Sequence, residues 1–116
     1  MDPIHKEVLT NMTSEIVERI SHPLLLLAYL RVILSIADLE EIEAETLQRG
    51  VTAGTQTILS ILKKRGPKAF ALFIHALLDL GNADLADDLE QEERKLRGEA
   101  GEFFILWEIT TNKMRL

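Results

Sequence analysis

The side chains with chemical potential in this 116-residue chain are its histidines, serines and carboxylates, because the chain contains no cysteine. That absence excludes disulfides, thiolate metal sites and a cysteine nucleophile. The three histidines lie in separate segments and form no His-x-x-x-His or His-Glu-x-x-His pattern. His75 and Asp79 are four residues apart, but two ligands do not make a metal site. We therefore expect no metal and no cofactor.

Catalytic patterns are equally sparse. The serines have no histidine with an acidic partner nearby in sequence and no flanking glycines of a nucleophile elbow. Gly50 and Gly54 lack the lysine and the preceding strand of a phosphate-binding loop. No carboxylate sits in an apolar run that would raise its pKa toward acid–base catalysis. We expect no catalytic residue and no enzyme.

Charge placement carries more information. The net charge of −6 argues against binding to nucleic acid, which depends on neutralising phosphates. Single-sign clusters on a small rigid protein steer its association with complementary surfaces, so they favour a protein-interaction module. The alternatives are a helical bundle with ordinary solvated charges, or a small DNA-binding or membrane-surface module. The clusters comprise five acids, four bases and a second acidic run: Asp38, Glu40, Glu41, Glu43, Glu45; Lys63, Lys64, Arg65, Lys68; and residues 79–93.

The elements that must position these charges are helices. Apolar residues recur at helical spacing between glycine and proline breaks, and no convincing alternating strand precedes residue 100. Short connections predict a compact antiparallel bundle. Asp38, with Glu41 three residues later, is expected to cap the third helix, and Leu47 to lie on its inner face. The six predicted helices span residues 2–20 (with a bend near 10–13), 23–35, 38–49, 55–65, 67–80 and 82–96.

Two apolar stretches stand out. Residues 24–37 are almost wholly apolar, but 14 residues that include Arg31 are too few to span a bilayer. We expect a central helix buried on most sides and no membrane insertion. Residues 101–116 carry a β-prone apolar cluster that either folds back onto the bundle or forms an exposed tail. The expected organisation is a bundle over residues 1–97 and a tail of unknown structure over residues 98–116.

Residues 63–77, KKRGPKAFALFIHAL, resemble the junction of the fourth and fifth helices in caspase recruitment domains (CARDs), most closely the N-terminal CARDs of initiator caspases. Residues 84–89, DLADDL, look like the sixth helix of those domains. The likeness covers roughly residues 4–92 and is specific at 63–77. It implies an all-α death fold, a six-helix antiparallel Greek-key bundle, with the C-terminal tail as an addition.

The resemblance also implies a function. CARDs bind other CARDs through surfaces of opposite charge, so the expected partners are CARD-containing caspases or adaptors in the cytoplasm, with homotypic oligomerisation possible. Arginines common in caspase CARDs are replaced here by neutral residues, near Thr13 and at Thr52 and Gln56, which implies that this chain acts mainly as the acidic member of a CARD pair. The chain would recruit caspases or block their recruitment; alternatively, it is the prodomain of an initiator caspase. The resemblance maps the acidic face to Asp38, Glu40, Glu41 and Glu43, and the basic patch comprises Lys63, Lys64, Arg65 and Lys68.

Overall fold

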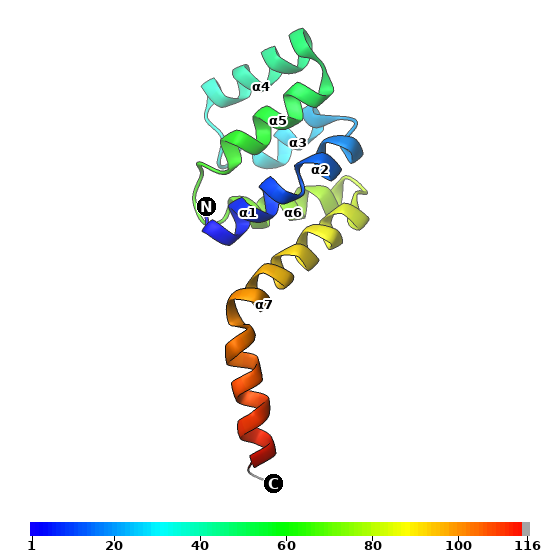
Figure 1. The fold of residues 1–116 in the computed structure, drawn as a ribbon. Helices are drawn as coiled ribbons and strands as arrows, with labels where there is room; N and C mark the ends of the chain where they lie inside the picture. The colour runs from blue at the N-terminus through cyan, green and yellow to red at the C-terminus, as the bar shows by residue number, and fades with distance from the viewer. Residues whose placement is uncertain (115–116) are drawn as a thin grey trace.

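Seven helices and no strand make up residues 1–114, the range whose backbone the structure, a computed structural model, describes (Figure 1). Side chains are described for residues 1–98. This confirms the all-α class. The helices are α1 (Pro3–Asn11), α2 (Thr13–Arg19), α3 (Pro23–Leu30), α4 (Ile36–Arg49), α5 (Val51–Leu62), α6 (Ala69–Asp79) and α7 (Ala83–Met114).

The predicted first helix is divided into α1 and α2 at Met12, inside the segment where we expected a bend. On either side of the break, Thr10 Oγ1 donates to the Lys6 carbonyl (2.9 Å) and Thr13 Oγ1 to the Leu9 carbonyl (2.7 Å). Threonine hydroxyls that bond back to the preceding turn tend to bend helices. Weak helix propensity and these two hydrogen bonds together account for the break.

The structure corrects the expected boundary between the second and third predicted helices. The helix α3 stops at Leu30 instead of continuing to residue 35, and α4 begins at Ile36. Its cap is Ser35, whose Oγ accepts from the Asp38 N–H (3.0 Å), while Asp38 Oδ2 accepts from the Ser35 N–H (3.0 Å). Asp38 is therefore the third residue of a reciprocal capping box, and the expectation that it caps the helix itself is wrong.

A single glycine separates α4 from α5. Gly50 has φ = 98°, a left-handed conformation that side-chain-bearing residues rarely adopt, and its N–H donates to the Thr46 carbonyl. The helix α5 begins directly afterwards, at Val51, four residues earlier than predicted. The two helices then approach closely at Gly54, where a Cβ atom would lie 2.0 Å from Thr46 Oγ1. Gly54 therefore allows an α4–α5 contact that no larger residue permits.

The last two helices meet at Gly81, which has φ = 83° and follows α6. The helix α7 continues to Met114, so the expected end of the last helix at residue 96 is wrong, and the backbone of the β-prone segment is helical up to that point. The side chains of residues 99–116 lie outside the described part. Neither alternative for the tail is tested there, and the boundary after residue 97 stays a prediction.

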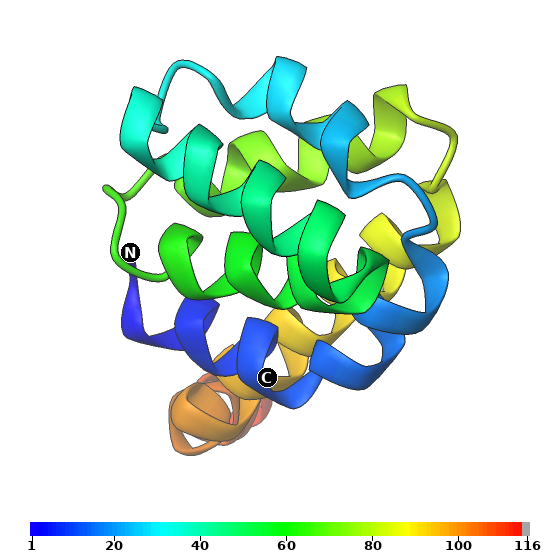
Figure 2. The same cartoon turned by 90° about the horizontal axis from the view of Figure 1, so that it is seen from above.

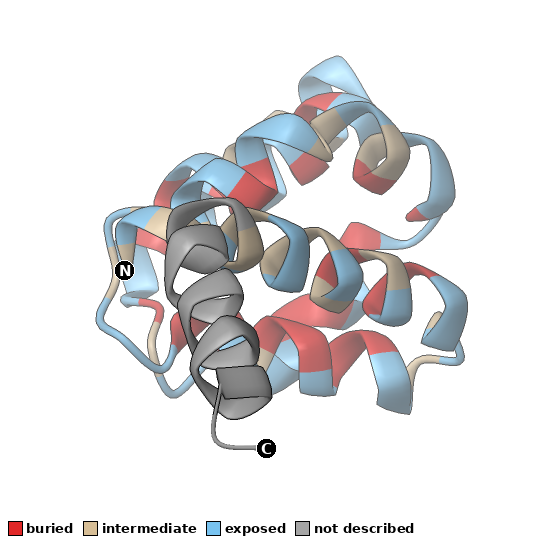
Figure 3. Cartoon of the chain, turned by 60° about the horizontal axis from the view of Figure 1, so that its bottom comes forward, coloured by how far each residue is buried: buried red, intermediate tan, exposed pale blue. Residues whose placement is uncertain are grey.

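Buried side chains from all seven helices form one core. Figure 2 shows how the helices pack together, and Figure 3 marks their buried residues in red. The helix α5 packs against α2, α3 and α4, while α6 packs against α3 and α7. Two expectations about burial are wrong. The helix α3 buries only one side, leaving Leu25 55% exposed, and Leu47 of α4 is 81% exposed instead of facing the core.

Candidate partner-binding surface

The acidic residues of α4 point in several directions because consecutive residues on an α-helix are rotated by about 100°. Ile42 is fully buried and defines the inner side of α4. Asp38, four residues earlier, shares that side and is only 9% exposed. Glu40, Glu41 and Glu43 are exposed, but Glu41 lies about 100° from Glu40 on the helix. The expected acidic face is therefore divided between at least two sides of α4.

Asp38 is engaged within the molecule. Arg65, which follows α5, donates from Nη2 to Asp38 Oδ2, the oxygen that also accepts from the Ser35 N–H. The Arg65 hydrogen bond, supported by the Ser35 N–H, lowers the pKa of the Asp38 carboxyl below its ordinary value. One member of the acidic face thus pairs with one member of the basic patch. At this corner, opposite charges from the two clusters meet within the molecule.

Residues of the two charge clusters also line a common pocket nearby. Glu41 of α4 and Lys64, just after α5, line the same open pocket of about 220 Å³. The side chains of Lys63, Lys64 and Lys68 surround the turn from α5 to α6, and Lys68 is the N-terminal cap residue of α6. The basic patch therefore borders the acidic α4 along the α4–α5 seam, where each sign partly screens the other.

One stripe of α4 escapes this screening. Its four residues recur at intervals of four, three and four, which places them within an arc of about 60° on the helix surface. All four are exposed, and neither acid has an ion-pair partner among the side chains of residues 1–98. This outer stripe consists of Ile36, Glu40, Glu43 and Leu47.

Part of the second acidic run, on α7, is engaged with α1 and α2. Asp88 pairs with Arg19 (2.6 Å), and Glu93 with His5 (3.1 Å). Sequence reasoning missed these contacts because the partners are 69 and 88 residues apart. They hold α7 against the first two helices and leave Asp84 and Asp87 as exposed acids of this run.

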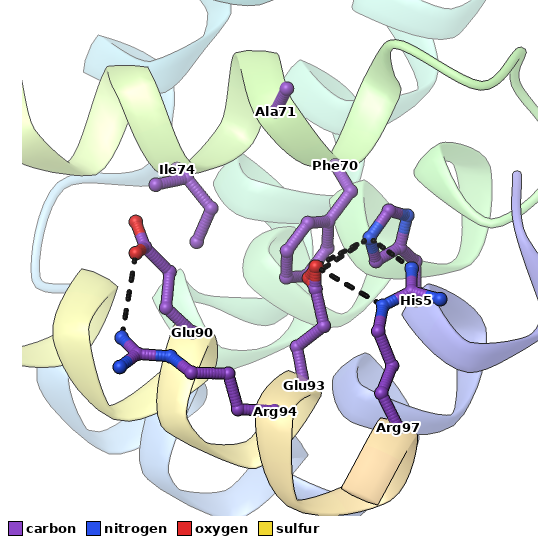
Figure 4. A pocket seen from close by; sticks show the side chains of 8 residues that line it. All are labelled: His5, Phe70, Ala71, Ile74, Glu90, Glu93, Arg94 and Arg97. Carbon is purple, nitrogen blue, oxygen red and sulfur yellow. Dashed lines mark hydrogen bonds and ion pairs between the residues drawn. The ribbon is translucent and has the colours of Figure 1, made fainter. Parts of the chain in front are cut away.

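The cavity in Figure 4, with a volume of about 350 Å³, lies between α1, α6 and α7 and is lined by the same His5 and Glu93 side chains. The His5 ring stacks on Phe70, with centroids 4.1 Å apart, and Glu93 lies between His5 and Arg97. Arg97 also forms an ion pair with Asp2 (3.0 Å), and this contact raises the pKa of the Arg97 guanidinium. The pKa of the Asp2 carboxyl is lowered, first by the hydrogen bond from the Ile4 N–H and then by Arg97. The charged groups neutralise one another, so the cavity's geometry serves helix packing.

Other candidate sites gain little from the structure. His75 Nε2 lies 3.7 Å from Asp79 Oδ2, and both side chains are largely exposed. No three potential metal-ligating side chains converge within the described residues. Within that same range, no helix combines the length and the apolarity that a membrane crossing requires.

Comparison with protein families gives one match: a model described as "Caspase recruitment domain" covers residues 1–93. Neither the search of curated proteins nor that of solved structures finds a match. The matched range contains α1 to α6, the part of α7 that pairs with α1 and α2, and both charge clusters of the α4–α5 seam. Its match covers well over half of the 116 residues and agrees with the all-helical architecture. The chain belongs to the caspase recruitment domain family.

Proposed function

We propose that this chain recruits other CARDs through its acidic face, with Glu40 and Glu43 as the principal contact residues. Members of the family are non-catalytic protein-interaction modules of apoptotic and inflammatory signalling that bind other CARDs. The observation that carries the assignment is the selective pairing of the charges. Asp38 is engaged with Arg65, whereas Glu40, Glu41 and Glu43 are exposed and have no ion-pair partner in the described part of the chain. Glu41 lines a pocket together with Lys64, so Glu40 and Glu43 are the two of these acids that lie outside that shared pocket.

The expected partner presents a basic surface. Complementary charge raises the association rate and fixes the orientation of two proteins, and it acts over a screening length of about 8 Å at physiological ionic strength. The neutral residues Thr13 and Gln56, where caspase CARDs often carry arginines, favour the acidic role for this chain. Lys63, Lys64 and Lys68 remain as a smaller basic surface that a second CARD can contact, which would permit homotypic oligomers.

The biological role that fits these contacts is regulation of caspase recruitment in the cytoplasm, either by bridging CARD proteins or by occupying a CARD and blocking it. The alternative is recruitment as the prodomain of an initiator caspase. Both roles use the same contact surface on a six-helix Greek-key death fold, in which α1 and α2 together correspond to the first helix. In this proposal the interaction domain spans residues 1–97, followed by the segment 98–116.

The test is charge reversal with a matched control. The pair Glu40→Lys and Glu43→Lys should abolish binding to a panel of purified CARDs with basic faces, measured by biolayer interferometry. Asp79→Lys with Asp87→Lys changes the net charge equally, at exposed acids on α6 and α7, and should leave binding within about twofold. An equal loss of CARD binding in the two double variants would show that the effect depends only on net charge. Unchanged binding in the first pair would refute the acidic-face assignment, provided that circular dichroism shows both proteins folded.

A further inference from the structure

The solvent-facing surface of α3 and α4 is unusually rich in apolar side chains. Seven of the eight large apolar side chains that are clearly exposed, among those the structure describes, belong to α3, its connection to α4, α4 itself or the first residue of α5. Concentrated apolar exposure of this kind marks interaction sites more often than scattered single residues do. The seven residues are Leu24, Leu25, Tyr29, Val32, Ile36, Leu47 and Val51.

The outer stripe of α4 combines this apolar character with charge. In order along the helix it reads apolar, acidic, acidic, apolar, from Ile36 (76% exposed) to Leu47 (81% exposed). At a rise of 1.5 Å per residue the stripe is roughly 16 Å long, or three helical turns. Helix-in-groove recognition uses the same spacing of anchors, at positions i, i+4, i+7 and i+11. The pattern therefore matches one face of a partner helix with apolar ends and a basic centre.

An apolar groove lies beside the Leu47 end of the stripe. It has a volume of about 340 Å³ and lies between the start of α3 and the α4–α5 corner, where Pro23, Leu24 and Leu25 face Thr46 and Val51. Thr46 lines the groove and precedes Leu47, so the groove lies at the same end of α4 as Leu47 but about 100° around the helix from it. The predominantly apolar lining and the size suit one large aliphatic or aromatic side chain.

We propose that this surface binds a helix of a partner protein on which two basic residues lie between two large apolar residues, one of which enters the groove. The inference rests on the proposed function, whose acidic contact residues form the centre of the stripe. Glu40 and Glu43 would pair with the two basic residues of the partner helix. The apolar ends would exclude water from those pairs and strengthen them.

Two other occupants fit less well. An anionic lipid surface is repelled by Glu40, by Glu43 and by the net charge of −6. A second copy of the chain offers the basic patch, but Lys63, Lys64 and Lys68 surround the turn between α5 and α6 and do not form a stripe along a helix. The 4-3-4 spacing also reads the same in both chain directions, so a partner helix fits parallel or antiparallel.

The experiment uses the full 116-residue chain and a synthetic lactam-stapled 14-residue peptide. The peptide carries Leu at positions 1 and 12 and Arg at positions 5 and 8, in an alanine and glutamine background. A control peptide of equal composition carries the arginines at positions 3 and 10, on the opposite helix face. Fluorescence anisotropy should show at least tenfold tighter binding of the first peptide. Leu47→Gln should weaken that binding about tenfold, while Leu78→Gln, at an exposed leucine of α6, should change it less than twofold.

Several results would overturn the inference. These are equal binding of the two peptides, wild-type affinity in Leu47→Gln, or displacement of the peptide by self-association of the chain at higher concentration. The failure of this inference is distinguishable from failure of the proposed function. If Leu47→Gln leaves peptide and CARD binding unchanged while the reversal of Glu40 and Glu43 abolishes CARD binding, only the apolar part is wrong. If CARD binding survives the reversal, the proposed function itself is wrong.

Discussion

Removing the Asp38 side chain tests the link between the two charge clusters most directly. Asp38→Ala deletes the acceptor of the Ser35 N–H, the negative charge in the first turn of α4 and the partner of Arg65. Loss of a capping side chain costs about 1 kcal/mol. An exposed ion pair contributes about 0–1 kcal/mol, and this one is at the upper end because the Asp38 side chain is only 12% exposed and that of Arg65 31%.

Together these losses should lower the free energy of unfolding by about 2 kcal/mol, which corresponds to roughly 10 °C in Tm for a domain of this size. Urea titration followed by circular dichroism measures the change. Asp38→Asn separates the contributions, because the amide oxygen can still accept from Ser35 but the charge is gone. It should cost about half as much, and its loss should not add to that of Arg65→Met in a double-mutant cycle.

The pH dependence gives the sign of the charge effect. Because Arg65, followed by the Ser35 N–H, lowers the Asp38 pKa, ionised Asp38 stabilises the folded state above the ordinary pKa of 3.8, and this stabilisation is lost as pH falls through the lowered pKa. The stability difference between wild type and Asp38→Asn should be constant from pH 7 to about 5 and shrink below about 4. A loss under about 0.5 kcal/mol in Asp38→Ala, or a difference from Asp38→Asn that persists undiminished at pH 2.5, would refute the reasoning.

Three further pairs of substitutions test the packing. Gly54→Ala should destabilise the protein by about 2 kcal/mol or more, since the new Cβ would lie 2.0 Å from Thr46 Oγ1. Gly66 has open space around it, so in the same urea titration Gly66→Ala should change the free energy of unfolding by less than about 0.5 kcal/mol. Leu77→Ala in the core should cost about 3 kcal/mol and Leu47→Ala less than about 0.5 kcal/mol; similar losses would contradict the exposure of Leu47. His5→Phe retains the stack on Phe70 and should keep Tm closer to wild type than His5→Ala does; because both variants lose the Glu93 contact, the reverse order would show that the stack does not stabilise the protein.

The helical class and most helix positions were predictable because their signals are local. Apolar spacing, Gly50 and Gly81 located the helices, and the weak helix formers near Met12 located the bend. The end of α3 was not predictable in this way, since its run of leucines has no polar side from which to infer the buried face. The start of α4 had a readable signal that we missed: Ser35 and Asp38 have the spacing of a capping box.

Predicting which charged side chains are free to contact a partner requires both local and long-range information. Five acids within eight residues form one cluster along the sequence, but a helix distributes them around its axis, and the buried Ile42 already shows which side faces the core. From that geometry alone, Asp38 is directed inward and Glu40 outward, while Glu41 and Glu43 lie on the two flanks, each about 100° from Ile42. What no local pattern supplies is the partner of Asp38, because Arg65 is 27 residues away and reaches it only through the packing of α4 on α5.

The distribution of paired and unpaired charges around α4 has a consequence for the specificity of binding. A partner attracted only by net charge would bind weakly at the α4–α5 seam, because acids and bases lie close together there and weaken each other's electric field. In the proposed binding mode, strong attraction is confined to the side of α4 that carries Glu40 and Glu43, which would restrict the orientation in which a basic surface can dock. The Asp38–Arg65 pair would then contribute to recognition indirectly, because it ties the start of α4 to the turn after α5 and so helps to set which acids face a partner.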